Sequence, residues 1–440
     1  MTIRKITGIG LLSLLPLFAA RGQAFAWGNT WMGIGLEQTV NAAHWKLGFL
    51  RYNAAFVLSN AGYDSDIYYG SLDHRVSDFT FSAGPDLHVF LPLKKRVVFE
   101  ISESPRYVFY RKTDRERSWN NAFAGNAHVV FDRLYFRAGG VLGDAKERLS
   151  TELNVNVRMK TEGVSGLVLW QASKGTSFTL QYQWSKYKYE NLSDEFPDIR
   201  ASLDRTQSQV DFTAYLQQRS RVRFYLAGRY GSYIFAERVS SFKDSHSYNA
   251  SAGLEFLAPE GGFEGLTAGL RGSIDLGYKR LNFLNPLLKD YSGLSGNAAI
   301  SVGIMKLTAL RLFFAMGPQF SAYTGLAYYR QTAFGAGLSR SLTKHAAITY
   351  DFGYSRNDYP AADVVTGDNP ERRSADKYLT HAIRLNFNVR RDFEISLLAD
   401  LGSRDSKLAP HMKSTRAFIG LSLTYGYAGV ASSMPTGPAS

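Results

Sequence analysis

The sequence predicts an all-β fold, a closed antiparallel transmembrane β-barrel of about 18 strands (16–18). Three observations predict it: polar and apolar residues alternate through most of the chain, short and long connectors alternate between the strands, and a secretory leader precedes them. Alternation with a period of two indicates a strand with one wet face and one apolar face. Most of the alternating segments have roughly the 9–11 residues that a tilted strand needs to cross a bilayer.

The N-terminus has the features of a cleavable secretory signal. Arg4 and Lys5 precede an apolar run over residues 6–20, and Ala24-Phe25-Ala26 places small residues at the spacing of a cleavage site. We therefore expect residues 1–26 to be removed by cleavage after Ala26, and residues 27–45 to form a short periplasmic segment. The chain contains no Cys, so strand pairing rather than a disulfide framework has to stabilise it after export.

Charge and hydropathy exclude two classes of protein. The formal net charge is +13, and loss of Arg4, Lys5 and Arg21 with the signal leaves +10. Lys and Arg are dispersed rather than gathered in blocks, which argues against nucleic-acid binding. After the signal, no stretch approaches the roughly 18 consecutive apolar residues of a membrane helix. We therefore expect the mature chain to cross the inner membrane completely.

The expected strands fall into a clear set and a weaker set. In the clear set, alternation is nearly unbroken: residues 178–184, 210–216, 222–230, 248–256, 266–278, 294–304, 379–389 and 417–427. The weaker strands fill the gaps between these: residues 46–59, 79–91, 97–110, 122–131, 134–141, 153–170, 310–322, 328–342, 346–359 and 393–401. Pro85, Pro105 and Pro318 lie inside weaker strands, which should be bent or bulged where a backbone donor is missing.

The connectors support closure and give the barrel an orientation. Tight connectors such as 132–133, 172–175, 306–308 and 391–392 alternate with longer polar ones such as 64–77, 190–203, 237–245, 360–376 and 402–412. Outer-membrane barrels have short periplasmic turns and long extracellular loops. Clusters of Tyr and Trp near the long connectors suit an aromatic girdle at the headgroup level. A closed barrel also satisfies every backbone group in hydrocarbon, which an open sheet cannot do.

The last strand resembles the C-terminal signal that outer-membrane assembly machinery recognises. Its apolar face carries Leu423 and Tyr425 and ends at Tyr427, while Gly420 lies on the other face. Unlike that signal, the aromatic residue is not terminal, because residues 428–440 follow as a tail rich in Ser, Pro and Gly. The composition of this tail predicts disorder.

At about 18 strands, side chains no longer fill the barrel interior, so a water-filled lumen becomes possible. The candidate pore-lining residues occupy the alternate positions of their strands that carry polar side chains: Arg223, Arg229, Arg271, Asp275, Lys279, Arg384, Arg390 and Arg416. Asp211 and Glu255 share this parity and partly compensate the positive charge. A cationic wall would concentrate anions. The alternative for each Arg is a structural ion pair across strands.

We found no catalytic or metal-binding motif and expect neither an enzyme nor a cofactor. Asp86 and His88 share one strand face, with His128 on another strand, and they are better explained as polar lumen lining than as a catalytic or metal site. His246 and His381 have apolar parity and should be interfacial. The chain has no hydrolase elbow, zinc-protease helix or phosphate loop.

Several turn and girdle motifs resemble the outer-membrane β-barrel family found beside exopolysaccharide biosynthesis genes. They are residues 290–294 (Asp-Tyr-Ser-Gly-Leu) opening a strand, 276–278 (Leu-Gly-Tyr) closing the preceding one, Asp358-Tyr359, residues 62–65 (Gly-Tyr-Asp-Ser) and Tyr68-Tyr69. The likeness extends loosely over residues 62–427 and covers structural residues. The resemblance implies a porin-like barrel that serves exopolysaccharide export, and it brings no catalytic or ligand residues.

Three functions follow as expectations, in order of preference. The first is an outer-membrane conduit for polysaccharide export or surface polysaccharide assembly, with a basic lumen that favours anionic solutes. The second is a general diffusion porin for small anions, and the third is a barrel hydrolase acting on lipid or peptide. The expected partners are outer-membrane lipid and lipopolysaccharide, the barrel-assembly machinery, anionic polysaccharide and export components, with no nucleic acid.

Overall fold

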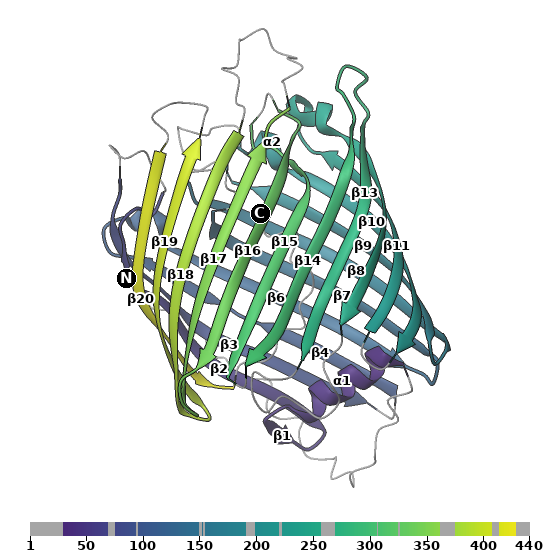
Figure 1. Ribbon diagram of the computed structural model, residues 1–440, viewed down its shortest axis with the longest axis horizontal. Coiled ribbons are helices and arrows are strands. Elements are labelled where there is room, and N and C mark those ends of the chain that lie inside the picture. Colours follow the sequence, from purple (N-terminus) through teal and green to yellow (C-terminus); the bar gives the residue numbers. More distant parts are fainter. Residues whose placement is uncertain are drawn as a thin grey trace, which may run out of the picture.

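The protein is an antiparallel β-barrel (Figure 1). A computed structural model describes residues 30–68, 75–93, 96–148, 152, 155–190, 199–219, 222–256, 269–305, 307–323, 326–360, 375–406 and 413–427. Within these residues, the sheet contains β1 (Trp45–Leu47), β2 (Leu50–Asp64), β3 (Asp78–Leu93), β4 (Val97–Glu103), β5 (Arg106–Tyr110), β6 (Ser118–Val130), β7 (Leu134–Glu147), β8 (Val157–Ser173), β9 (Thr176–Tyr189), β10 (Arg205–Arg219), β11 (Val222–Phe235), β12 (Ser245–Phe256), β13 (Leu270–Phe283), β14 (Tyr291–Met305), β15 (Thr308–Phe320), β16 (Tyr328–Ser341), β17 (Ala346–Asp358), β18 (Ala375–Arg390), β19 (Phe393–Ser406) and β20 (Lys413–Gly426).

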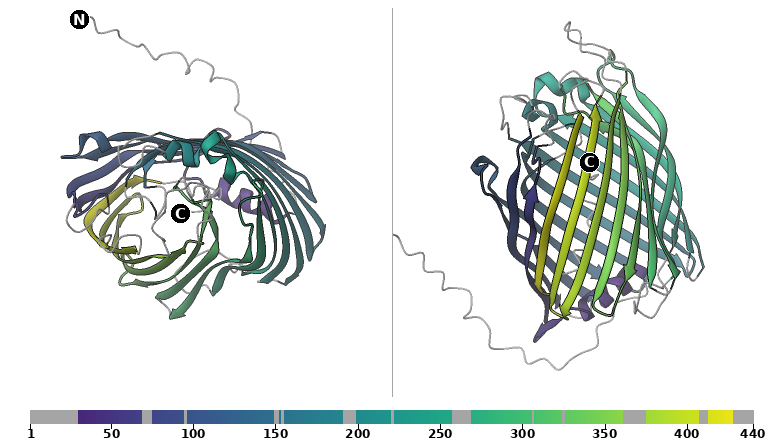
Figure 2. Two further views of the ribbon diagram at one scale, coloured as in Figure 1. Left: turned by 90° about the horizontal axis from the view of Figure 1, so that it is seen from above. Right: turned by 60° about the vertical axis from the view of Figure 1, so that its left-hand side comes forward.

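The wall of the barrel consists of 18 strands, as the sequence predicts. The three-residue β1 pairs with the start of β2, and β4 and β5 are two parts of one strand, because both pair with β3 and β6. Each remaining strand pairs with its neighbours along the chain, and β2 pairs with β20 to close the ring. Viewed from above, the strands surround an interior space (Figure 2).

Two of the three prolines coincide with distortions of the sheet. Pro105 lies in the gap between β4 and β5, where the expected strand 97–110 is interrupted. Pro85 is opposite Phe56 in β2, whose register shifts a few residues later, near Asn60 with its positive φ of 53°. Pro318, in contrast, pairs in register with Arg330 near the end of β15. The missing backbone donor thus coincides with a strand interruption at Pro105 and lies near a bulge of the paired strand at Pro85. At Pro318 the sheet keeps its register.

Several strands extend further toward the long connectors than the sequence predicts. The predicted strand 178–184 ends instead at Tyr189, and 417–427 begins at Lys413. The predicted strand 266–278 becomes β13, from Leu270 to Phe283, and its first residues lie outside the described part. The strand expected at 153–170 is β8, which starts at Val157. Beyond the apolar band the strands continue with polar residues. The regular alternation of polar and apolar residues does not reach these ends, so the sequence pattern does not predict them. The predicted signal and C-terminal tail also lie outside the described residues.

A helix, α1 (Trp31–Asn41), lies inside the barrel at the end with the short turns, here called the short-turn rim (Figure 1). The Thr30 side chain caps it by accepting a hydrogen bond from the Gly33 amide at 3.2 Å. Leu36, Val40 and the following Ala43 recur at helical spacing and are buried against the wall. Sequence alternation predicted a periplasmic segment here without assigning a helix. Among the described residues, no helix is long and apolar enough to cross a membrane.

Candidate functional site

The candidate pore-lining residues, with one exception, share the parity of the inward face. On β13, Leu270 and Leu276 are exposed on the outside, and Arg271, Asp275 and Lys279 alternate with them. The same alternation relates Arg384 to the exposed Ile383 on β18, and Arg223 and Arg229 to Phe224 and Tyr230 on β11. Arg390 differs, because it follows a register shift at the end of β18 and pairs with Phe393, on the outward face of β19. Arg416 likewise alternates with the exposed Ile419 on β20. Residues directly opposite each other on paired strands point to the same face of the sheet. The strand register therefore shows which residues of each neighbouring strand face inward.

Three of these cations form ion pairs with neighbouring strands. Arg223 lies 3.4 Å from Glu255, and Arg229 pairs with Asp211. Arg416 binds Asp64 at 2.7 Å and lies 3.7 Å from Asp400. The first two pairs match the carboxylates expected as compensation. Cross-strand carboxylates therefore largely neutralise the charge of these three side chains.

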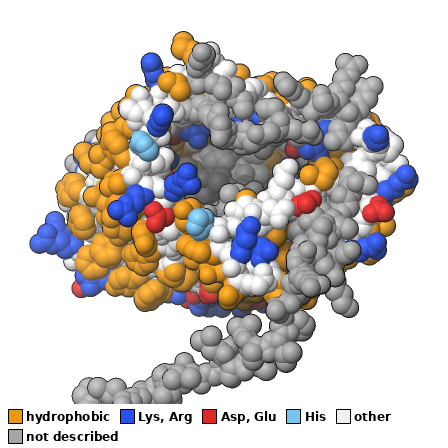
Figure 3. All heavy atoms as spheres, turned by 90° about the horizontal axis from the view of Figure 1, so that it is seen from below, with side chains coloured by type: hydrophobic (Ala, Val, Ile, Leu, Met, Phe, Trp, Pro, Cys, Tyr) orange, Lys and Arg blue, Asp and Glu red, His pale blue; other side chains and the backbone are white. Residues whose placement is uncertain are grey.

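Three other candidate cations of the described part are not in ion pairs of this kind: Lys279, Arg384 and Arg390. Within the described residues, none of the three has a carboxylate oxygen within 4.0 Å. They lie on β13 and β18 at different heights and do not form a compact cluster. Seen from the short-turn rim, apolar side chains cover the flank of the barrel, and Lys and Arg side chains are scattered along its edge (Figure 3). The positive charges of these three residues are thus distributed over β13 and β18 rather than gathered at one point.

One large apolar side chain faces the lumen and is exposed there. Phe313 of β15 is opposite Ala299 of β14 and Gly335 of β16, both of which face inward, and its side chain is 46% exposed. The other strongly exposed large apolar side chains in the middle of the described strands face outward. Its ring occupies the space that a Cβ at Gly335 would need. Two residues along, Arg311 binds Asp351 at 2.7 Å across Gly337. The alternation of Leu310, Leu312 and Phe314 with Arg311 and Phe313 could have revealed this face.

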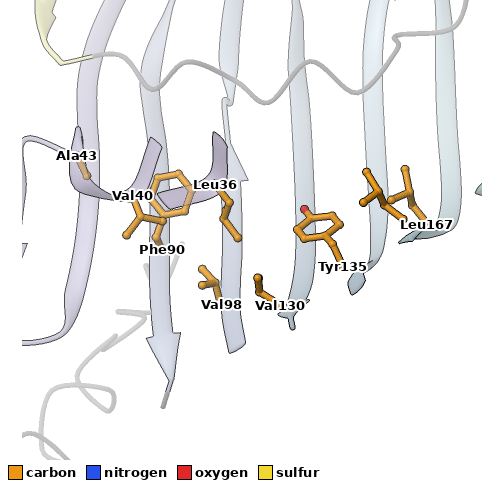
Figure 4. Close-up of a cluster of buried hydrophobic side chains, with 9 residues drawn as sticks. Leu36, Val40, Ala43, Phe90, Val98, Val130, Tyr135 and Leu167 are labelled. Carbon is orange, nitrogen blue, oxygen red and sulfur yellow. The ribbon is translucent and has the colours of Figure 1, made fainter. Parts of the chain in front are cut away.

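Helix α1 covers the opposite half of the lumen near the short-turn rim. Its apolar face packs on inward side chains of β3, β4, β6, β7 and β8, including Phe90, Tyr135 and Leu167 (Figure 4). At its first residue, the Trp31 ring contacts Tyr215 of β10 edge-on at 5.7 Å and lies 4.3 Å from the Arg223 guanidinium. The described contacts of α1 thus run from β3 to β11. The wall that carries Lys279, Phe313 and Arg384 lies outside them.

A buried polar network supports the wall beneath α1. Glu100 of β4 accepts hydrogen bonds from the side chains of His88 at 2.7 Å, His128 at 3.0 Å and Asn126 at 3.1 Å. His128 also bonds the Tyr135 hydroxyl at 2.7 Å through its second ring nitrogen. All five side chains are less than a tenth exposed.

The network changes the interpretation of the two histidines. His88 and His128 do meet, but on the carboxylate of Glu100 rather than on Asp86, which lies 3.3 Å from Arg106 instead. In the described part of the chain, no group of three His, Cys, Asp or Glu side chains has the geometry of a metal site. Sequence analysis missed Glu100 because a single Glu on a strand carries no motif. The side chains stabilise the fold, and Tyr135 links them to α1.

At the long-loop rim, connectors between strands pack into a second cluster. It contains α2 (Ile199–Leu203), the 3-10 helix η3 (Arg238–Lys243) and residues near Ala322, while a shorter 3-10 helix, η2 (Asp114–Glu116), lies elsewhere on this rim. The Lys243 ammonium is fully buried and donates to the carbonyl oxygens of Ser202, Ser321 and Tyr323 at 2.9–3.2 Å. Burial lowers the pKa of Lys243 to about 7, although the nearby Glu152 opposes the shift and Arg205 adds to it.

The depressed pKa of Lys243 predicts a pH-dependent stability for this cluster. Lys243 takes up a proton when the loops open, so rising pH should disfavour opening between about pH 7 and the ordinary value of 10.5. The opening equilibrium should fall by up to about tenfold per pH unit in that window and level off below it. Hydrogen-exchange protection of residues 238–243, corrected for intrinsic exchange, measures this. A pH-independent protection, or the same slope in Lys243→Met, would contradict the assignment.

The remaining predicted residues lie near the barrel seam and on the outer surface. Gly420, Leu423 and Tyr425 belong to β20, and Tyr427 follows it and stacks on His44 at 3.5 Å. The recognition of these residues by assembly machinery stays a prediction. His246 and His381 face outward, and each bonds a Tyr hydroxyl, Tyr230 at 3.0 Å and Tyr350 at 2.8 Å.

Solved structures with a similar fold include outer-membrane proteins of two Pseudomonas species. OccK1 (OpdK) from Pseudomonas aeruginosa is 10% identical, with 85% of this chain and 98% of that chain covered and a TM-score of 0.50. A second structure of this outer membrane protein gives 11% identity, coverages of 85% and 98% and a TM-score of 0.49. A BenF-like porin from Pseudomonas fluorescens Pf-5 is 9% identical, with coverages of 86% and 98% and a TM-score of 0.48. At these identities the likeness concerns the fold alone.

A family match goes further than the fold. None of the curated proteins compared with the chain matches it. The family described as "Putative beta-barrel porin 2" matches residues 169–426, which is more than half of the chain and runs from β8 to the end of β20. The chain therefore belongs to this family of porin-like β-barrels.

Proposed function

We propose that the protein is a passive conduit of the bacterial outer membrane that serves the export or surface assembly of an anionic polysaccharide. Membership of a porin family supports a channel. The observation that carries the choice of cargo is the lumen wall from β13 to β18, which combines uncompensated cations with one exposed aromatic ring. Energy coupling is not required of this chain, because diffusion or guided threading moves the cargo.

The chemistry of this wall suits a negatively charged sugar. Lys279 and Arg384 attract carboxylate or sulfate groups, because no acidic side chain of the described part lies within 4.0 Å of them. The Phe313 ring offers an apolar surface to the C–H face of a pyranose. The adjacent ion pair of Arg311 and Asp351 offers donors and acceptors to hydroxyl groups. In this proposal the partners in the envelope are outer-membrane lipid, the barrel-assembly machinery and export components.

Planar-bilayer recording of the refolded protein tests this function. The unmodified barrel should prefer anions over cations, and an oligosaccharide of uronic acids should interrupt its current. The variant Lys279→Gln, Arg384→Gln should lose most of the anion preference, since the cations in ion pairs remain neutralised. A control with Lys174→Gln and Lys344→Gln removes the same charge from the short turns, and its anion preference should equal that of the wild type.

Each outcome of this recording has a defined meaning. Anion preference without interruption by the saccharide would favour a general porin for small anions. Equal selectivity in the wild type and the Gln variant would overturn the lumen assignment. Absence of conductance would overturn both transport functions.

A further inference from the structure

A row of charged side chains crosses the outer surface of β17 to β20 at the long-loop rim. Arg356, Lys377, Asp405 and Lys413 are successive cross-strand neighbours. On each strand they lie on the same face as an apolar residue that is 40–69% exposed on the outside, namely Tyr350, Ile383, Leu401 and Ile419. The charged row therefore faces the surroundings of the barrel and lies directly above its apolar band.

Two adjoining hollows lie on this part of the outer surface. Their volumes are about 420 Å³ and 340 Å³, and both are lined by Leu379, Ser403 and Thr415. Leu401 and Ala417 add an apolar floor to the first, and Lys377 and Lys413 border the second. Arg75, from the connector between β2 and β3, reaches the same place and donates to the Thr415 hydroxyl. The hollows thus have an apolar floor and a cationic border.

The charges of this border are not balanced. Arg356 pairs with Asp358 at 2.6 Å, which also binds Arg330. Lys377, Lys413 and Arg75 have no carboxylate oxygen within 4.0 Å among the described residues, although Asp405 lies between the two lysines in the row. Cations that border an apolar surface at the level of lipid headgroups attract phosphate.

We propose that this groove binds a phosphorylated glycolipid of the outer leaflet. Long loops are extracellular in barrels of this kind, so the groove lies at the level of the outer leaflet, and its cationic border is complementary to a headgroup that carries phosphate. Lys377, Lys413 and Arg75 hold the phosphate, and an acyl chain lies over Leu379 and Leu401. This site is on the outer surface, so it is independent of what passes through the lumen.

Native mass spectrometry of the intact, detergent-purified barrel tests the site with lipid A carrying two phosphates. The double variant Lys377→Gln, Lys413→Gln should lower the apparent affinity by about tenfold or more, because each lysine near a membrane surface contributes to anionic-lipid binding. The control Lys174→Gln, Lys344→Gln removes the same charge from the short-turn rim. Its affinity should equal that of the wild type.

A second lipid distinguishes phosphate recognition from general adhesion. Dephosphorylated lipid A should bind the wild type and the double variant alike, and more weakly than the phosphorylated form binds the wild type. Equal affinity of the two lipids for the wild type would overturn the proposal. An unchanged affinity in the double variant, or an equal loss in the control, would also overturn it. Native-like strand content by circular dichroism establishes that each variant is folded.

Discussion

Replacement of Glu100 by Ala is expected to lower the free energy of unfolding by about 3–5 kcal/mol. The carboxylate accepts hydrogen bonds from His88, His128 and Asn126, and all of these side chains are buried. Truncation leaves three donors without this acceptor in an environment that water does not reach, and each such loss costs roughly 1–3 kcal/mol. Glu100→Gln keeps one acceptor oxygen and should cost less than Glu100→Ala.

Urea unfolding of the barrel in phospholipid vesicles, followed by tryptophan fluorescence, measures this loss. Glu103→Ala is a matched control on the same strand, because its carboxylate is only partly buried and accepts one long bond from Asn121 at 3.5 Å. The control should lose less than about 1 kcal/mol. A similar loss in Glu100→Ala and Glu103→Ala would mean that the network does not stabilise the wall.

Release of α1 from the wall is expected to raise the single-channel conductance by about half or more, since a helix is about 10–12 Å wide with its side chains. Leu36→Asp with Val40→Asp places two carboxylates against the apolar surface formed by Phe90, Val98 and Val130. Burial of each wild-type side chain contributes roughly 1.5–3 kcal/mol, so the pair holds α1 in place. The released helix stays tethered through β1, and open-channel noise should rise as well.

The exposed side of α1 supplies the control for this change. Ile34 is 45% exposed, and Gln38 is exposed on the same helix. Ile34→Asp with Gln38→Asp adds the same charge without disturbing the packed face, so its conductance should stay near that of the wild type. Equal conductance in all three proteins would show that α1 does not narrow the path. An equal rise in both variants would point to charge rather than release.

The sequence predicts the barrel well because its pattern is physically constrained. A strand between lipid and water must alternate, as Leu270 to Lys279 does, and a closed ring needs paired edges, which β2 and β20 provide. Pro105 also marks the interruption between β4 and β5. The family resemblance on turn and girdle motifs agrees with the porin family that matches residues 169–426.

Tertiary packing explains what the sequence did not predict. The Thr30 cap and the spacing of Leu36, Val40 and Ala43 indicate a helix, but only the wall of β3 to β8 shows why it lies inside the barrel. The alternation places Asp211 and Glu255 on the same face as Arg223 and Arg229, but it does not point to Asp64 as the partner of Arg416. The roles of Glu100 and Lys243 depend on partners from distant parts of the chain, to which no sequence spacing points.

The zero-current potential of the unmodified barrel across a KCl gradient in a planar bilayer tests the central claim most directly. If the wall with Lys279 and Arg384 lines an open path, the potential must have the sign of chloride preference. It should move toward zero when both residues are replaced by Gln. A potential of the opposite sign, or one that the substitution leaves unchanged, would contradict the account.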